Sequence, residues 1–177
     1  MLVHINSYPG VGKLTIGRAL ADQIGGKLLD NHSIYNIAFA LTEFRSPSFY
    51  DTVRATRDLA YQRVLALPAM TPVILTNWYS KGSAWGEENW DEVISLARRR
   101  PCTLDVVILS CSLDENVRRI QSSGRDAMRK PRDVTLVNGN RDGRPLIDRG
   151  GDRLLHLDVS HLSAESAAAA IAKWLAE

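Results

Sequence analysis

Residues 2–24 constrain the fold most strongly, because a strand pattern, a glycine-rich turn and a helix pattern follow one another there. Residues 2–5 are mostly apolar, and apolar side chains recur at helical spacing from Ile16 to Ile24. The sequence between these two patterns is NSYPGVGKLT. We therefore expect a strand that passes into a helix through a loop whose backbone N–H groups can surround an anion.

This loop follows much of the phosphate-binding pattern G-x-x-x-x-G-K-[ST], in which the lysine reaches the terminal phosphates. Ser7 stands at the position of the first glycine, and Leu14 replaces the hydroxyl that usually contacts magnesium. We predict that seven consecutive residues contact the nucleotide: Pro9, Gly10, Val11, Gly12, Lys13, Leu14 and Thr15. Lys13 is the predicted catalytic cation. A glycine-rich turn before an ordinary helix is the alternative interpretation.

Length and charge limit what can surround this loop. A chain of 177 residues with 45% hydrophobic content predicts a single domain, residues 1–177, with a substantial core. The formal net charge of +2 provides no general field for a polynucleotide, so nucleic acid is not an expected partner. The two cysteines, Cys102 and Cys111, flank or lie in an apolar run, which favours reduced thiols. Without a signal-like leader or a run of about eighteen apolar residues, we expect a cytoplasmic protein with no membrane partner.

Strand and helix patterns alternate along the chain. The strand patterns cover residues 2–5, 27–30, 72–76, 103–110 and 154–158. The helix patterns cover residues 13–24, 33–42, 48–67, 87–99, 113–121 and 163–175. This alternation predicts an α/β fold whose parallel sheet is covered by helices on both faces. Residues 138–152, rich in Gly, Asp and Arg, are expected to form a long exposed loop.

Polar residues follow the second expected strand, where parallel sheets bind their ligands. Asp30 ends that strand and is the predicted catalytic base, because a carboxylate there can accept a hydroxyl proton during phosphoryl transfer. Capping of the next helix is its competing role, and the two roles can coexist. His32 is a second candidate, as base or as a contact to the acceptor substrate. Its alternative role is that of a hydrogen-bond donor at a helix start.

The long helix and the loop after the third strand supply further candidates for binding the acceptor. Arg54 and Arg57 lie three residues apart on one helix face, and we select Arg57 to hold an acidic or hydroxyl-rich acceptor. Their alternative is a solvated face that pairs with Glu43, Asp51 and Asp58. Trp78 follows the third strand, and Trp85 lies further along. Such aromatic side chains favour a flat or partly apolar acceptor, although tryptophans also serve ordinary packing.

A basic run extends from Arg118 to Arg132 and is interrupted by Ser-Ser-Gly. An arginine on a mobile segment can neutralise the charge that develops on a transferring phosphate. We predict a lid at approximately residues 122–133 with Arg125 as its catalytic arginine and Arg119 as a nucleotide contact. A nucleic-acid patch and a solvated face are the alternatives. No aromatic residue is interleaved with the cations, which disfavours base stacking.

The spelling PGVGKLT resembles the PGSGKGT-type loop of adenylate kinases. Together with the Asp-Asn-His after the second strand, the arginine-bearing helix and an R-x(5)-R lid candidate, the whole chain resembles the nucleoside monophosphate kinase-like group of P-loop kinases. Shikimate kinase, gluconate kinase and chloramphenicol phosphotransferase are members of similar size. The resemblance implies a three-layer P-loop NTPase sandwich with sheet order 2-3-1-4-5. It also implies ATP and Mg²⁺ as cofactors, with magnesium held mainly through water and phosphate near Thr15.

Two departures from this group narrow the expected function. Shikimate kinases carry D-x-D and Gly-Gly-Gly motifs where this chain has DNH and TNWYSKG, which argues against shikimate as the acceptor. The third strand ends in Thr76 and Asn77, where a magnesium-orienting carboxylate is common. We expect an ATP-dependent phosphotransferase that acts on a hydroxyl of a small-molecule acceptor. The alternatives are a nucleotide or nucleic-acid 5'-hydroxyl kinase and a non-catalytic ATP-binding regulatory module, the latter favoured by Leu14 and Asn77.

Overall fold

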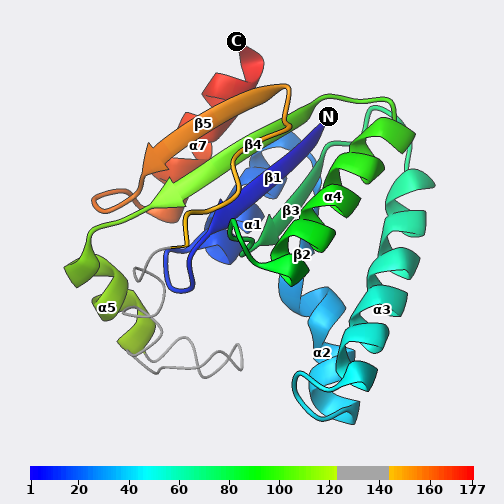
Figure 1. Cartoon of the computed structure of the whole chain (residues 1–177). Coiled ribbons are helices and arrows are strands. Elements are labelled where there is room, and N and C mark those ends of the chain that lie inside the picture. Colours follow the sequence, from blue (N-terminus) through cyan, green and yellow to red (C-terminus); the bar gives the residue numbers. More distant parts are fainter. Residues whose placement is uncertain (123–143) are drawn as a thin grey trace.

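A computed structural model of the chain describes residues 1–122 and 144–177. Its centre is a five-stranded sheet in the order β2-β3-β1-β4-β5, and every pairing is parallel (Figure 1). The strands are β1 (Leu2–Ser7), β2 (Lys27–Asp30), β3 (Val73–Asn77), β4 (Leu104–Ser110) and β5 (Arg153–Asp158). The predicted sheet and its strand order are confirmed.

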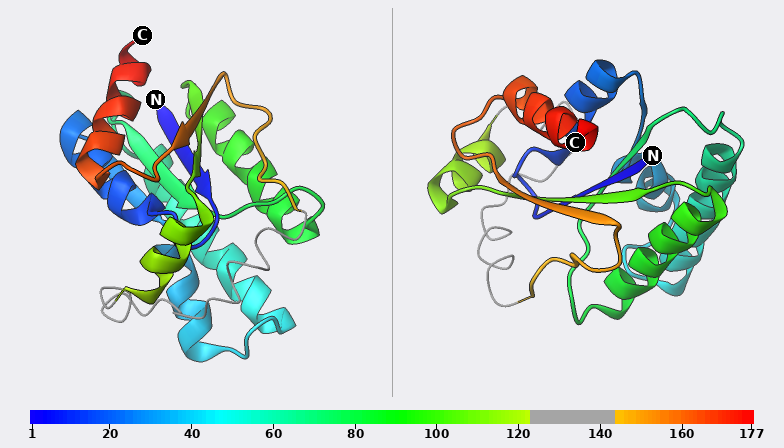
Figure 2. Two further views of the ribbon diagram at one scale, coloured as in Figure 1. Left: turned by 90° about the vertical axis from the view of Figure 1, so that its left-hand side faces the viewer. Right: turned by 90° about the horizontal axis from the view of Figure 1, so that it is seen from above.

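Helices cover both faces of the sheet, as strands buried on both sides require. The described helices are α1 (Lys13–Ile24), α2 (Asn31–Leu41), α3 (Pro47–Leu65), α4 (Ala84–Arg99), α5 (Leu113–Gln121) and α7 (Ala164–Ala176). Helices α1 and α7 pack on one face, while α3 and α4 pack on the other (Figure 2, right). The predicted three-layer arrangement is therefore confirmed. Within the two described ranges, no helix is both long and apolar enough to cross a membrane.

Side-chain caps explain why several helices begin earlier than their apolar patterns indicate. The Asp30 carboxylate accepts the His32 backbone N–H, so α2 begins at Asn31. The Ser83 hydroxyl caps α4 in the same way by accepting the Gly86 N–H. Such caps satisfy backbone donors that have no partner inside the helix. Helix α4 therefore begins at Ala84, three residues before the expected start at residue 87, so Trp85 lies within it.

The chain before β5 differs from the exposed loop expected at residues 138–152. In its described part, Leu146 and Ile147 are buried. The Ile147 backbone exchanges hydrogen bonds with the core, since its N–H donates to the Tyr79 carbonyl and its carbonyl accepts from Asn6 Nδ2. Two adjacent apolar side chains within a polar stretch are enough to dock this segment beside β1. The prediction of an exposed loop was wrong there. It was based on the Gly, Asp and Arg content of the segment and did not consider the apolar pair Leu146 and Ile147.

The most buried strands carry polar side chains. His4 of β1 has no exposed surface, donates from Nε2 to the Asn77 amide oxygen at 3.0 Å, and stacks on Tyr79. The His4 and Trp90 rings meet in a T-shaped arrangement, with their ring centroids 4.8 Å apart. Burial lowers the pKa of His4 from 6.5 to about 3, against the opposing effect of the Asn77 hydrogen bond. His4 is therefore neutral in the folded protein at neutral pH.

This burial predicts a specific acid sensitivity. Unfolded His4 takes up a proton as the pH falls below 6.5, whereas folded His4 stays neutral until about pH 3. The contribution of His4 to stability is thus complete above pH 6.5 and declines below it, by about 1.4 kcal/mol per pH unit. Urea unfolding at pH 7, 6 and 5 should show a steeper loss of unfolding free energy for the parent than for His4→Phe. His156→Gln, which changes an exposed histidine, is the control and should lose unfolding free energy with falling pH as steeply as the parent. An equally steep loss in the parent and in His4→Phe would contradict the assignment.

Candidate active site at the carboxyl edge of the sheet

The loop between β1 and α1 has the backbone geometry of an anion cradle. Gly10 and Gly12 adopt left-handed conformations, with φ of 88° and 112°. A Cβ atom on Gly10 would lie 2.5 Å from both Asn116 Nδ2 and Ile120 Cγ1, so only glycine fits there. The Lys13 side chain folds back over the loop, and its Nζ donates to the Ser7 and Tyr8 carbonyls at 3.2 and 3.3 Å.

Helix α5 holds the loop from the side opposite this cradle. Asn116 Nδ2 donates to the Pro9 carbonyl at 3.0 Å, and Arg119 Nη1 donates to the Val11 carbonyl at 2.6 Å. Arg119 Nη2 also reaches the Val159 carbonyl at the end of β5, at 2.7 Å. Because these loop carbonyls face α5, the N–H groups at the start of α1 are left to face a ligand. Arg119, the predicted nucleotide contact, lies directly against the loop.

Glu115 keeps Arg119 in place. Its carboxylate accepts a hydrogen bond from Arg119 Nε at 2.5 Å and two from Arg118. Hydrogen bonding by Arg118 and then by Arg119 lowers the pKa of Glu115 to about 2. Glu115 is therefore ionised at neutral pH and fixes the direction in which the Arg119 guanidinium points. The sequence analysis did not select Glu115 or Asn116. Their spacings of four and three residues from Arg119 place all three on one side of the expected helix, which would have indicated that they act together.

Asp30 lies at the carboxyl end of β2, beside the end of β3. Its Oδ1 accepts a hydrogen bond from Thr76 Oγ1 at 2.7 Å, and its Oδ2 accepts the His32 N–H at 3.2 Å. The residue is 9% exposed. The structure thus shows the capping role directly, and it also fixes the carboxylate at the edge where the phosphate loop lies. An ionised carboxylate has about four acceptor positions, so two remain for a ligand hydroxyl.

A second polar pair continues this edge. Asn77 Nδ2 donates to Asn31 Oδ1 at 3.0 Å, while Asn77 Oδ1 accepts from His4. The buried imidazole therefore orients the Asn77 amide, and that amide joins the ends of β2 and β3. Asn77 ends β3, at the position where a magnesium-orienting carboxylate is common.

The residues at this edge suit magnesium that is bound mainly by nucleotide phosphates and water. Leu14 is buried in the core, whereas Thr15 in the first turn of α1 is exposed. Across residues 1–122 and 144–177, no three or more His, Cys, Asp or Glu side chains cluster as a metal site. Magnesium that is bound to a nucleotide commonly keeps phosphate oxygens and water as most of its ligands, and Thr15 offers a hydroxyl oxygen at the start of α1.

A group of aromatic side chains, three of them partly buried against the core, extends from the predicted base along α2. We call it the aromatic wall; it comprises His32, Tyr35 and Phe39 of α2, Tyr50 of α3 and Trp85 of α4. Neighbouring ring centroids lie 4.8 to 6.4 Å apart, and Trp85 Nε1 donates to the Tyr35 hydroxyl at 2.8 Å. Burial is the main cause that raises the pKa of Tyr35 to about 12, so its hydroxyl stays neutral. The wall begins two residues from Asp30.

The other tryptophans of this region divide into two groups. Trp78, predicted to contact the acceptor, directly follows β3 and is 44% exposed. Trp90 has no exposed surface, and its Nε1 donates to the Arg149 carbonyl at 3.0 Å. Trp90 is therefore a packing residue, whereas Trp78 is accessible beside Asn77.

The two arginines of α3 are paired with acids and amides. Arg57 is 5% exposed, and its Nη1 lies 2.9 Å from Asn89 Oδ1 and 3.6 Å from Glu88 Oε1. Arg54 holds Glu88 through two hydrogen bonds, from Nε at 2.8 Å and from Nη2 at 2.9 Å. Arg57 is thus buried between α3 and α4, and its predicted contact with the acceptor stays a prediction. Asn89 and Glu88 come from α4, whereas Asp58, a pairing partner that the sequence offered as the alternative, lies on α3 itself, 3.6 Å from Arg57 Nε.

The predicted lid arginine, Arg125, lies outside the described residues, as does the predicted lid except for Ser122, which ends α5. Its role stays a prediction.

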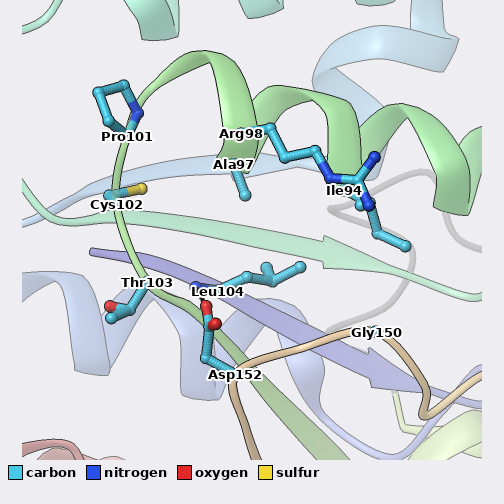
Figure 3. A pocket seen from close by; sticks show the side chains of 9 residues that line it. All are labelled: Ile94, Ala97, Arg98, Pro101, Cys102, Thr103, Leu104, Gly150 and Asp152. Atoms are coloured by element: carbon cyan, nitrogen blue, oxygen red, sulfur yellow. Dashed lines mark hydrogen bonds between the residues drawn. The ribbon is translucent and has the colours of Figure 1, made fainter.

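A separate hollow of about 580 Å³ lies at the opposite edge of the sheet, near the amino ends of β4 and β5 (Figure 3). Its lining residues are Ile94, Ala97, Arg98, Pro101, Cys102, Thr103, Leu104, Gly150 and Asp152. The Asp152 carboxylate is already used, because it accepts the Leu104 N–H at 2.7 Å. None of the predicted site residues lines this hollow, so it is not part of the candidate active site.

Solved structures share this fold. A protein from Chloroflexus aurantiacus j-10-fl described as a candidate kinase superposes with a TM-score of 0.70 at 20% identity, covering 99% of this chain and 95% of its own. A gluconokinase from Sinorhizobium meliloti 1021 superposes with a TM-score of 0.58 at 17% identity, and the match covers 98% of this chain and 94% of the gluconokinase. A shikimate kinase from Bacteroides thetaiotaomicron superposes with a TM-score of 0.58 at 16% identity, and the match covers 100% of this chain and 99% of the shikimate kinase. The sequence matches no family model and no curated protein. This chain therefore shares its fold with these three structures.

The packing of the loop predicts that Gly10 is more sensitive than other left-handed glycines. Gly10→Ala combines a left-handed φ with contacts of 2.5 Å to Asn116 and Ile120, so it should lower the free energy of unfolding by about 2–5 kcal/mol. Gly25→Ala is the matched control, because Gly25 is also left-handed but has no atom within 4 Å of the new Cβ. It should cost about 1–2 kcal/mol. Urea unfolding measures both, and equal costs would contradict the close packing of α5 on the loop.

Proposed function

We propose that this protein transfers the terminal phosphoryl group of ATP to a hydroxyl group of a small molecule. The observation that carries the proposal is the phosphate loop braced by α5, with Lys13 over its glycine turn, at the same sheet edge as Asp30. The structural neighbours support the proposal, since they include a sugar kinase, a gluconokinase and a shikimate kinase. Open parallel sheets bind ligands at this edge.

The phosphate loop would hold the nucleotide. The N–H groups at the start of α1 face the phosphates, and the helix dipole adds to their attraction for negative charge. The Lys13 ammonium neutralises charge on the terminal phosphates. Bound Mg²⁺ would supply further neutralisation of the phosphate oxygens, and Thr15 is the side chain proposed to lie near it, mainly through water.

Asp30 would act as the general base. The acceptor hydroxyl gives its proton to the Asp30 carboxylate while its oxygen bonds to phosphorus, and the bond from that phosphorus to the bridging oxygen breaks to release ADP. Thr76 and the His32 N–H hold the carboxylate in one orientation, which reduces the freedom lost when the acceptor binds. Arg125 is proposed to neutralise the transferring phosphoryl group, and Trp78 and His32 to contact the acceptor.

A non-catalytic ATP-binding module is the second candidate, and two observations favour it. Leu14 is buried where a magnesium-binding hydroxyl is usual, and the Asn77 amide is held between His4 and Asn31. A protein of this kind binds ATP and transfers nothing, so measurement of the reaction products separates the two candidates.

Removal of the Lys13 cation tests the nucleotide site. ATP with magnesium should raise the melting temperature of the parent, because a ligand bound only to the folded state stabilises it. Lys13→Ala should lose most of this shift, since its ammonium contacts the phosphates. Lys27→Ala, at the exposed start of β2 on the opposite edge, is the control and should keep the parental shift. An undiminished shift in Lys13→Ala would refute the site.

Conversion of Asp30 to Asn separates chemistry from capping. Asn keeps the size of the side chain and still caps α2, but it cannot take the hydroxyl proton. Phosphoryl transfer to an acceptor found by screening should fall about 100-fold or more, the scale for a lost general base, while ATP affinity stays near the parental value. Ser83→Ala, which removes the cap of α4, controls for the effect of a lost cap. Near-parental transfer by Asp30→Asn would dismiss Asp30 as the base and turn attention to His32.

A further inference from the structure

The aromatic wall joins the predicted base to a large apolar surface. His32, Tyr35 and Phe39 lie on one side of α2, at spacings of three and four residues, and this row starts beside Asp30. Phe39 is 48% exposed, and its ring lies 5.9 Å from that of Phe44, which is 59% exposed. A small molecule whose hydroxyl reaches Asp30 would therefore extend along aromatic rings.

The charges behind this wall are already compensated. Arg54 and Arg57 face three carboxylates within ion-pair distance, those of Asp51, Asp58 and Glu88. The Arg54 hydrogen bond is the main cause that lowers the pKa of Glu88, so Glu88 remains ionised. The formal charge of this group of five side chains is −1. Neither arginine is left as an uncompensated cation for an anionic acceptor.

We propose that the acceptor presents an uncharged aromatic or apolar part to the aromatic wall, and that Glu88 enforces this choice by compensating Arg54 and Arg57; the proposal rests on the proposed function. A carboxylate placed near Arg57 would also lie near the ionised Glu88 and would lose its own hydration. A neutral ring meets no such cost, and stacked aromatic pairs contribute beyond simple burial. Specificity would thus come partly from a repulsive element.

This assignment separates the chain from two of its structural neighbours. A gluconokinase and a shikimate kinase share this fold. The compounds after which these two enzymes are named, gluconate and shikimate, are carboxylates. In this chain the Arg57 guanidinium is engaged by Asn89 Oδ1 at 2.9 Å and by Glu88 Oε1 at 3.6 Å. Any contact between Arg57 and the acceptor is then hydrogen bonding to a neutral group.

Matched probes test the preference by equilibrium binding. The probes are 2-(4-hydroxyphenyl)ethanol and 4-hydroxyphenylacetate. They share the hydroxyphenyl ring, but the first carries a primary alcohol where the second carries a carboxylate. With a non-hydrolysable ATP analogue and magnesium present, the parent should bind the alcohol at least about tenfold more tightly than the carboxylate, as expected when one unit charge is excluded. Calorimetry or a thermal shift gives the ratio of the two dissociation constants. A carboxylate bound as tightly as the alcohol, or no stabilisation by either probe, overturns the proposal.

Two variants locate the cause of the preference. Glu88→Gln leaves Arg54 and Arg57 less compensated, so it should move the ratio towards the carboxylate by about fivefold. Glu87→Gln is the control, because Glu87 pairs with Arg149 on another side of α4, and it should keep the parental ratio. Trp85→Leu gives a measurement independent of Glu88: it should weaken binding of the alcohol by about fivefold. An unchanged ratio in Glu88→Gln, or unchanged alcohol binding in Trp85→Leu, overturns the proposal.

Phosphoryl transfer is measured separately, through release of ADP from ATP. Absence of transfer, together with the expected binding ratios, would remove the proposed function and leave the specificity of the wall in place. Transfer to the carboxylate probe in preference to the alcohol would keep the function and overturn the specificity.

Discussion

The reversal of the chain between β1 and α1 is the constraint on which the rest of the structure depends. Two glycines with positive φ allow the backbone to turn within five residues, from the end of a fully buried strand to the start of a helix. The turn directs N–H groups to one side and carbonyls to the other. The carbonyl side then needs partners, and Asn116 and Arg119 supply them. The position of α5 follows from this requirement.

The same edge of the sheet also explains why β1 and β3 carry polar residues in a buried setting. Buried polar groups are tolerated when they are hydrogen-bonded to one another. Thr76 pairs with Asp30, and Asn77 pairs with both His4 and Asn31. These bonds tie the ends of β2 and β3 together and connect them to the middle of β1. They also hold the predicted base in a single orientation, so the stability of the sheet and the geometry of the site share the same contacts.

On the face covered by α3 and α4, charge compensation and aromatic packing act together. Arg54 lies over the Trp85 ring, with its guanidinium carbon 5.1 Å from the ring centroid, and also binds Glu88. A cation that is both stacked and paired is held firmly. The wall therefore has a fixed shape and little free charge, which suits recognition by surface shape more than by attraction of an anion.

The sequence by itself determined the order of strands and helices, the phosphate loop and the placement of Asp30 at a strand end, because these depend on local periodicity and on residues adjacent in the chain. It did not reveal the pairing of Asn6 with Ile147, which are 141 residues apart, or the hydrogen bond from Arg57 to Asn89. The docking of Leu146 and Ile147 was likewise decided by tertiary structure. Long-range partners depend on which elements the sheet order brings together, and no local pattern encodes that choice. The candidate site residues were visible in the sequence, but the charges that surround them were set only by the fold.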